Sequence, residues 1–261
     1  MTFGCAIVCA VLASGPVSAG GVLDRYAKDG CVIGPDATRP AQAQLALQNG
    51  WAVAQGDWLV LGAESCTMVP PQIEPEISAA DREVFEDITA INRAEEPQYQ
   101  GCFVDPVGVQ SALQATRGWS AERAFSEYFA MVAAGIVSGE WRFFSDSPLR
   151  TPTSVQYVGG KCAQVPYAAQ LAQSHDELIG SYDGFVRANA RYVACEVGEP
   201  IMSFKWTESY QSLGEGLPVN AWHPFELQLM ALGAGMIEDA SLREKGTLRP
   251  PFCVHDGLIT Q

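Results

Sequence analysis

Six cysteines recur along the body of this chain, and two of them stand in the same short string. Residues 30–35 are GCVIGP and residues 101–106 are GCFVDP, so both copies follow the pattern Gly-Cys-apolar-apolar-x-Pro. Each copy is followed by Ala-Leu-Gln, then by Gly-Trp, and later by a Gly-acidic-Trp string at residues 56–58 or 139–141. A fainter third copy is visible where residues 234–237, AGMI, match residues 134–137, AGIV. Matched strings in the same order indicate an internal repeat, so we expect a series of similar units.

The repeat also predicts how the cysteines pair. Each unit begins near one cysteine and ends near the next, which gives the pairs Cys31–Cys66, Cys102–Cys162 and Cys195–Cys253. By the chain-entropy model, each bond would stabilise its unit by roughly 3.5 to 4.5 kcal/mol. Zinc binding is the competing interpretation, but the sequence has no CxxC pair of the kind that zinc sites use. We therefore expect three disulfides, no metal and no cofactor.

The first twenty residues predict export. Residues 3–13, FGCAIVCAVLA, form an apolar run of the length found in secretory signals, and small residues at Val17-Ser18-Ala19 predict cleavage after Ala19. Residues 1–19 are therefore interpreted as a signal peptide, and its removal leaves no expected membrane span and an even set of six cysteines. An uncleaved N-terminal anchor is the alternative, because residues 1–23 contain no charge. The expected location is periplasmic or secreted.

Charge and composition restrict the class of partner. The chain has 30 acidic residues against 16 Lys and Arg, a formal net charge of -14, and its hydrophobic content of 48% is typical of a folded protein. Nucleic-acid binding depends on basic side chains that displace counterions from phosphates. We therefore predict no nucleic-acid partner.

Local patterns predict an α+β fold of tandem winged-helix-like units, each a helix, a second helix and a β-hairpin closed by a disulfide. In the second unit, residues 107–117 form a helix that ends at Gly118, and Ser120 caps a second helix with apolar residues at helical spacing. Short strands with turn residues between them follow. The first unit is abbreviated, with one helix at residues 38–49 and a hairpin at residues 51–61 that turns at Gly56-Asp57.

The predicted organisation has five parts. After the signal peptide come a first unit at residues 20–69, a Pro-rich acidic linker at residues 70–77 and a second unit at residues 78–165. The third unit, residues 166–261, begins with a long helix at residues 167–192 and is expected to pack on the second. His175 lies on the apolar side of that helix and is interpreted as a structural histidine.

The candidate binding residues lie in the third unit. Trp51, Trp119, Trp58 and Trp141 recur at equivalent positions, so they are expected to build the units. The aromatic and polar residues outside the repeat are the candidates for a binding site: Trp206, Tyr210, Trp222, His223 and Glu226. No catalytic residue is assigned, because the pairing leaves no free thiol in the mature chain and the three histidines are dispersed.

Together these features predict an exported, non-enzymatic binding or assembly protein of the cell envelope, whose partner is a protein or an envelope polymer. The alternative is a periplasmic or secreted hydrolase that uses two carboxylates. Its candidate carboxylates are Asp57, Glu140, Glu226, Glu238 and Asp239. A hydrolase requires a pocket with convergent polar groups, whereas a binding module requires an exposed apolar patch or a free sheet edge.

Overall fold

The computed structural model describes residues 23–91, 101–143, 155–165, 168–190, 195, 223–238 and 247–255. Its helices are α1 (Ala41–Gln48), α2 (Arg82–Phe85), α3 (Pro106–Arg117), α4 (Ala121–Ser138), α5 (Ala168–Ala190) and α7 (His223–Gly233), with 3-10 helices η1 (Asp24–Asp29) and η3 (Gly160–Cys162). Its strands are β1 (Val32–Ile33), β2 (Ala52–Gln55), β3 (Trp58–Leu61), β4 (Ile88–Ile91), β5 (Gly101–Val104), β6 (Trp141–Arg142), β7 (Gln156–Tyr157), β8 (Ile237–Glu238) and β9 (Thr247–Leu248). Helices and small antiparallel sheets make this an α+β fold, as the sequence predicted.

The first unit is a strand, a helix and a hairpin. β2 and β3 pair antiparallel across the Gly56-Asp57 turn, where Gly56 has a φ of 56°. β1 pairs with β3, so the strand order is β1-β3-β2 and β2 lies at an edge. Ile33, Leu59 and Leu61 are fully buried on one face of this sheet. These residues belong to the single apolar core of the molecule.

The second unit carries the two helices that the sequence predicted. The Asp105 side chain accepts the backbone N–H of Val107 at the start of α3, and the Ser120 hydroxyl accepts that of Arg123 at the start of α4. α3 ends at Gly118 in the left-handed conformation, which glycine adopts without a Cβ clash. The sheet order is β4-β5-β7-β6, so the hairpin strands β6 and β7 pair next to β5.

The first two units share a strand order. In each, the Gly-Cys string forms the first strand, and the last strand of the hairpin lies between the first strand and the middle one. The first unit has one helix between them and the second has two, as the abbreviated copy predicted. In the third unit, β8 and β9 pair antiparallel after α7. The winged-helix-like description of all three units stays a prediction.

Three disulfides join the described residues, and they are the sequential pairs that the repeat predicted. Cys31–Cys66, Cys102–Cys162 and Cys195–Cys253 have S–S distances of 2.04, 2.01 and 2.01 Å. Five of these cysteines are buried, and the sixth, Cys102, packs against the core. Each bond therefore joins the two cysteines expected to close one predicted unit.

Residues 70–77, predicted as a linker, run in extended form against the body of the molecule. Ile77 is buried and Ile73 packs on the core, while Arg123 of α4 binds Glu76 with an N–O distance of 2.7 Å. Lys28 donates to Gln72 at 3.0 Å from the other side. The segment thus contributes packing contacts to both neighbouring units.

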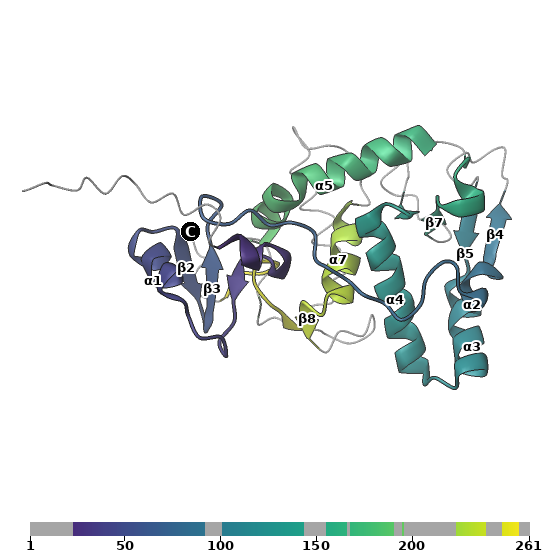
Figure 1. Ribbon diagram of the computed structural model, residues 1–261, viewed down its shortest axis with the longest axis horizontal. Coiled ribbons are helices and arrows are strands. Elements are labelled where there is room, and N and C mark those ends of the chain that lie inside the picture. The colour runs from purple at the N-terminus through teal and green to yellow at the C-terminus, as the bar shows by residue number, and fades with distance from the viewer. Residues whose placement is uncertain are drawn as a thin grey trace, which may run out of the picture.

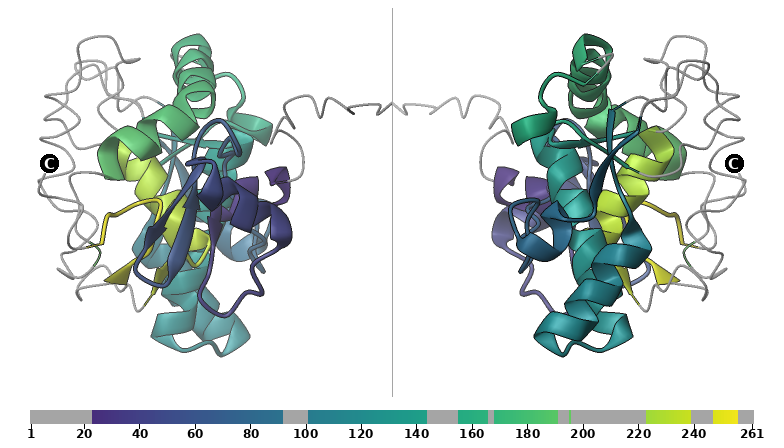
Figure 2. Two further views of the ribbon diagram at one scale, coloured as in Figure 1. Left: turned by 90° about the vertical axis from the view of Figure 1, so that its left-hand side faces the viewer. Right: turned by 90° about the vertical axis from the view of Figure 1, so that its right-hand side faces the viewer.

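α4 and α7 lie side by side in the middle of the molecule, with the first unit at one end and β4 and β5 at the other (Figure 1). α5 crosses above them, and both end-on views keep it on that side of the body (Figure 2). One continuous apolar core includes residues from all three units. No described helix has the length and apolar character needed to cross a membrane.

Candidate functional site

The five residues predicted as a binding site divide into two groups. Trp206, Tyr210 and Trp222 lie outside the described residues. His223 is the first residue of α7, and Glu226 follows one turn later. Both side chains are buried, with only 2% of each residue exposed. Because neither is reachable from solvent in this conformation, these two residues form part of the core between α5, α7 and β6.

Glu226 holds the end of β6. Its Oε1 accepts the backbone N–H of Phe143 at 3.1 Å. Its Oε2 lies 3.9 Å from His223 Nε2 and has no hydrogen-bond partner among the described residues. Burial raises the pKa of Glu226 to about 7, although the Phe143 N–H and the nearby Arg142 charge both lower it. The carboxyl is therefore protonated over much of the acidic range.

His223 binds α5. Its Nε2 lies 3.1 Å from the Ser174 carbonyl oxygen and 3.2 Å from the Ser174 hydroxyl. A carbonyl only accepts, so Nε2 carries the hydrogen in this contact and cannot also take a proton from the hydroxyl. Burial lowers the pKa of His223 to about 4, so the ring is neutral at physiological pH. Ser174 and His223 therefore do not form a nucleophile and base pair.

Arg142 is the buried cation of this cluster. It donates from Nε to the Leu171 carbonyl at 3.3 Å and from a terminal nitrogen to the Trp141 carbonyl at 2.8 Å. Burial lowers its pKa to about 10, and the charges of Glu226 and Asp176 oppose that change. Arg142 thus remains charged at neutral pH and joins β6 to α5.

His175 is partly buried, and its interpretation as a structural histidine stays a prediction. Its Nε2 lies 3.1 Å from the Val137 carbonyl near the end of α4, and burial lowers its pKa. Together with Arg142, Ser174, His223 and Glu226 it makes a polar cluster that joins α4, α5, α7 and β6. These contacts fix how the second and third units pack.

Within the described residues, the carboxylates named for the hydrolase alternative do not come together as a pair. Asp57 is exposed at the β2–β3 turn and Glu140 is exposed after α4, whereas Glu226 is buried beside α5. The pKa of Glu226 shows no contribution from another acidic group. The side chain of Glu238 and the whole of Asp239 lie outside the description. Within the described ranges no three metal-binding side chains gather either.

A cavity of about 260 Å³ lies between the first unit and the C-terminal segment. Sequence reasoning did not identify it. Its lining is mostly apolar and comes from residues far apart in the chain: Gly50, Trp51, Ala52, Val53, Gln55, Val60, Leu61, Gly62, Arg187, Ala190, Pro251 and Val254. β2 forms one wall of this cavity, and the end of α5 with residues 251–254 forms the opposite wall.

β2 is the edge strand beside this cavity, exposed at Val53 and Ala54 but buried at Ala52. Gly62 N donates to the Trp51 carbonyl on the β2 side of β3, whereas Leu61 N donates to the Cys31 carbonyl on the β1 side. The backbone groups of successive β3 residues therefore point toward β2 and β1 in turn. Val53 therefore exchanges hydrogen bonds with Val60, while the N–H and C=O groups of Ala52 and Ala54 point away from β3. No described residue hydrogen-bonds these outward groups.

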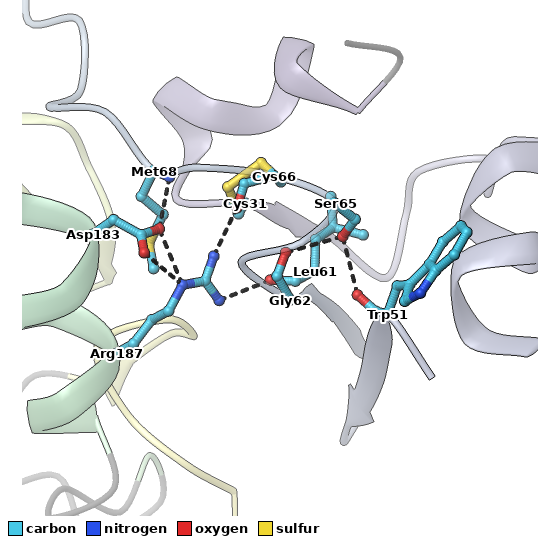
Figure 3. The surroundings of a disulfide bond; sticks show 9 residues. All are labelled: Cys31, Trp51, Leu61, Gly62, Ser65, Cys66, Met68, Asp183 and Arg187. Atoms are coloured by element: carbon cyan, nitrogen blue, oxygen red, sulfur yellow. Dashed lines mark hydrogen bonds and ion pairs between the residues drawn. A yellow bond between two sulfur atoms is a disulfide. The ribbon is translucent and has the colours of Figure 1, made fainter. Parts of the chain in front are cut away.

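The cavity wall is held by one arginine of α5 (Figure 3). Arg187 donates to the Leu61 carbonyl at 2.8 Å and to the Cys66 carbonyl at 2.9 Å, and it pairs with Asp183 one turn earlier at 3.0 Å. Asp183 in turn accepts the backbone N–H of Met68 at 2.8 Å. α5 is thus tied to both ends of the segment that leads from β3 to the Cys31–Cys66 disulfide.

The sequence gives little signal for this second site. β2 reads Ala-Val-Ala-Gln, and none of these side chains carries chemistry that a motif search detects. Comparison of the chain with protein-family models, curated proteins and solved structures found no significant match.

Proposed function

We propose that this chain is an exported, non-enzymatic binding or assembly protein of the cell envelope, with a protein or an envelope polymer as its partner. The observation that carries the proposal is the free edge of β2 beside an open apolar cavity. Unpaired edge groups next to apolar surface are a template for association, and proteins normally protect such edges with charge or proline. β2 has neither, and Val53 is 51% exposed.

The disulfides support the location. Disulfides persist in oxidising compartments, so the three bonds indicate an extracellular or similarly oxidising environment. This agrees with the predicted signal peptide at residues 1–19 and with a periplasmic or secreted protein.

The shared strand order of the first two units supports a tandem arrangement of winged-helix-like units. The contact between α4 and α7 supports packing of the third unit on the second. A winged-helix-like order alone does not assign a function, and a net charge of -14 opposes nucleic-acid binding. The units are therefore best regarded as a scaffold that presents β2.

The hydrolase alternative has weaker support. Glu226 has the raised pKa that a general acid needs, but it is buried and no described carboxylate accompanies it. None of the residues around Glu226 lines the cavity beside β2. A buried polar cluster of this kind is better explained by its packing role.

Photo-crosslinking from two matched positions tests the proposal. A photoreactive amino acid would replace Val53 on β2 or Leu45 on α1, since both residues are 51% exposed and both are apolar. In the exported protein, irradiation should give a discrete adduct from position 53 and none from position 45. Equal yields at both positions, or no adduct from position 53, would contradict a binding role for this edge.

A further inference from the structure

A second cavity lies beneath the segment that joins the first two units. Its volume is about 360 Å³, compared with about 260 Å³ for the cavity beside β2. Residues 71–79 form its outer wall, and the end of α4 with Trp141 forms its inner wall (Figure 1). Close-packed interiors contain few voids larger than a water molecule, whereas ligand sites usually measure roughly 300 to 1,000 Å³. The size of this space therefore suits a small ligand.

The outer wall alternates between apolar and polar positions. Every second residue is apolar, lines the cavity and is at least partly buried: Pro71, Ile73, Pro75, Ile77 and Ala79. The residues between them, at positions 72, 74, 76 and 78, are exposed. A period of two is typical of an extended chain with one side buried. The 71–79 segment therefore turns an apolar side toward α4.

This segment is fastened from its solvent side. Gln72 accepts a hydrogen bond from Lys28 at 3.0 Å, and Glu76 pairs with Arg123 of α4 at 2.7 Å. The Glu127 carboxylate also accepts the backbone N–H of Glu76 at 2.9 Å. Because these contacts hold the segment across α4, a large partner would have to displace it, whereas a small molecule fits beneath it. The geometry thus favours a small molecule over a polymer or a folded protein.

The polar side chains of the lining are already engaged. Gln72 binds Lys28. The Ser78 hydroxyl donates to the Asp81 carboxylate at 2.9 Å. The Ser138 hydroxyl donates to a backbone carbonyl of α4 at 3.2 Å. The cavity therefore offers a ligand mainly apolar contacts.

Charge restricts the ligand further. No Lys, Arg or His is among the described residues that line this cavity. Glu140 also lines it and is exposed, so this residue lies where the cavity meets solvent. A charged group that leaves water without a partner loses its hydration energy. An anion would meet no cation in the described lining and would approach Glu140, and a cation would find no buried carboxylate there.

We infer that this cavity binds an uncharged, apolar small molecule. A closed cavity of about 150 Å³ is enough for benzene. The larger volume here suits a ligand of about two aromatic rings, or an aliphatic chain of similar bulk. None of the described residues that line this cavity also lines the one beside β2. The inference therefore goes beyond the proposed function and does not depend on it.

Two related dyes test the chemical class of the ligand. Phenylnaphthylamine is uncharged at neutral pH, and anilinonaphthalene sulfonate carries a sulfonate on the same ring system. Both dyes fluoresce more strongly in apolar surroundings than in water. With the full oxidised chain, the uncharged dye should bind saturably, and the sulfonate should bind at least about tenfold more weakly. Equal affinity for the two dyes, or no binding of the uncharged dye, would contradict the inference.

Substitutions at three positions locate the bound dye. Ala134 lines the cavity from α4, so Ala134→Phe should fill part of the space and weaken binding of the uncharged dye at least about tenfold. Ala115→Phe adds the same side chain at an exposed position of α3 and should change the affinity less than about twofold. Val53→Phe adds bulk to the cavity beside β2 and should have equally little effect.

Ile73→Asp keeps the inference falsifiable if Ala134→Phe fails to fold. Position 73 lies in the extended wall and outside any helix, and a carboxylate there would place a charge against the bound dye. This variant should also weaken binding of the uncharged dye at least about tenfold, while its circular dichroism matches that of the unmodified protein.

Retained affinity in a folded Ala134→Phe or Ile73→Asp variant overturns the inference. Loss of binding in Val53→Phe would place the dye beside β2 and overturns it as well. The crosslink expected from position 53 does not involve this cavity. The proposed function can therefore survive if the dye experiments fail, and the cavity can be a ligand site if no crosslink forms.

Discussion

His223 and Glu226 are both buried, and their effects on the pH dependence of the free energy of unfolding should largely cancel. Substitution of either residue alone should make the effect of the other measurable. Glu226 has a folded pKa of about 7 against an ordinary value of 4.5, so its folded state retains a proton that the unfolded chain has lost. His223 has a folded pKa of about 4 against 6.5, so its folded state excludes a proton that the unfolded chain takes up. Between about pH 4.5 and pH 6.5 the two effects oppose each other.

The sign of each contribution follows from proton linkage. For Glu226 alone, the free energy of unfolding is highest below pH 4.5 and falls as the pH rises toward 7. The reason is that the carboxyl ionises less readily in the folded state than in the unfolded chain. For His223 alone, it is highest above pH 6.5 and falls as the pH drops toward 4. Each difference between the folded and unfolded pKa changes the free energy of unfolding by about 3 kcal/mol across the pH interval between the two values, at 1.36 kcal/mol for each unit of pKa.

Glu226→Gln should therefore make stability rise with pH between about 4.5 and 6.5 relative to the unmodified protein, by about 3 kcal/mol. His223→Gln should make it fall over the same interval by a similar amount. In the double variant, the difference in free energy of unfolding from the unmodified protein should not change with pH over this interval, because both titrating groups are gone. Glu64→Gln, at an exposed position, is the matched control and should leave the slope alone.

Urea unfolding at several pH values, followed by circular dichroism with the disulfides intact, measures these differences directly. Because only differences between variants are compared, titrating groups that all the variants share cancel. Parallel pH profiles for the two single variants and the unmodified protein would refute the linkage argument, and with it the burial of this pair.

Two further changes test the packing. Arg187→Gln removes the donor to two carbonyls and the charge beside Asp183, so the free energy of unfolding in urea should fall by about 3 kcal/mol, and a loss below about 0.5 kcal/mol would show that the contact is dispensable. Gly135→Ala should lower the free energy of unfolding by about 3 kcal/mol, because a Cβ there would overlap the Trp141 ring. Gly180→Ala on α5 is the control: its Cβ meets nothing within 4 Å, so it should raise the thermal midpoint through a gain of about 0.5 to 1 kcal/mol.

Features set by neighbouring residues could be predicted from the sequence. The N-cap at Ser120 and the left-handed helix end at Gly118 depend on local backbone preferences. The end of α4 was predicted wrongly at Gly135, since the helix continues to Ser138. The β2–β3 hairpin follows in the same way from the turn at Gly56. The cysteine pairs could be predicted for a different reason, because the repeated strings indicate where each predicted unit begins.

Features set by tertiary packing could not be predicted. Glu226 was a plausible surface ligand because acidic residues are usually exposed, yet the packing of α7 on α5 buries it. Proline and glutamate in residues 70–77 indicated a linker, but they gave no sign that Ile73 and Ile77 pack on the core. Local composition gives no information about which surface a segment will meet.

The edge strand β2 illustrates the same limit. A hairpin at residues 51–61 was predictable, but whether β2 or β3 becomes the edge depends on which of them β1 joins. β1 pairs with β3 through Val32 and Val60, and this single choice leaves the outward groups of Ala52 and Ala54 unpaired. The site was therefore invisible to a search for reactive side chains.

The way this edge is fixed explains how so short a strand could bind a partner. β2 has only four residues, so a partner bound there would gain few contacts, and flexibility in β2 would reduce that gain. The Cys31–Cys66 disulfide and the Arg187 contacts to Leu61 and Cys66 hold the segment after β3 to α5. Because this ordering is already present in the free protein, little conformational entropy remains to be lost on binding. In the proposed binding role, the disulfide and the partly buried Arg187 would hold the edge and the cavity in place before a partner binds.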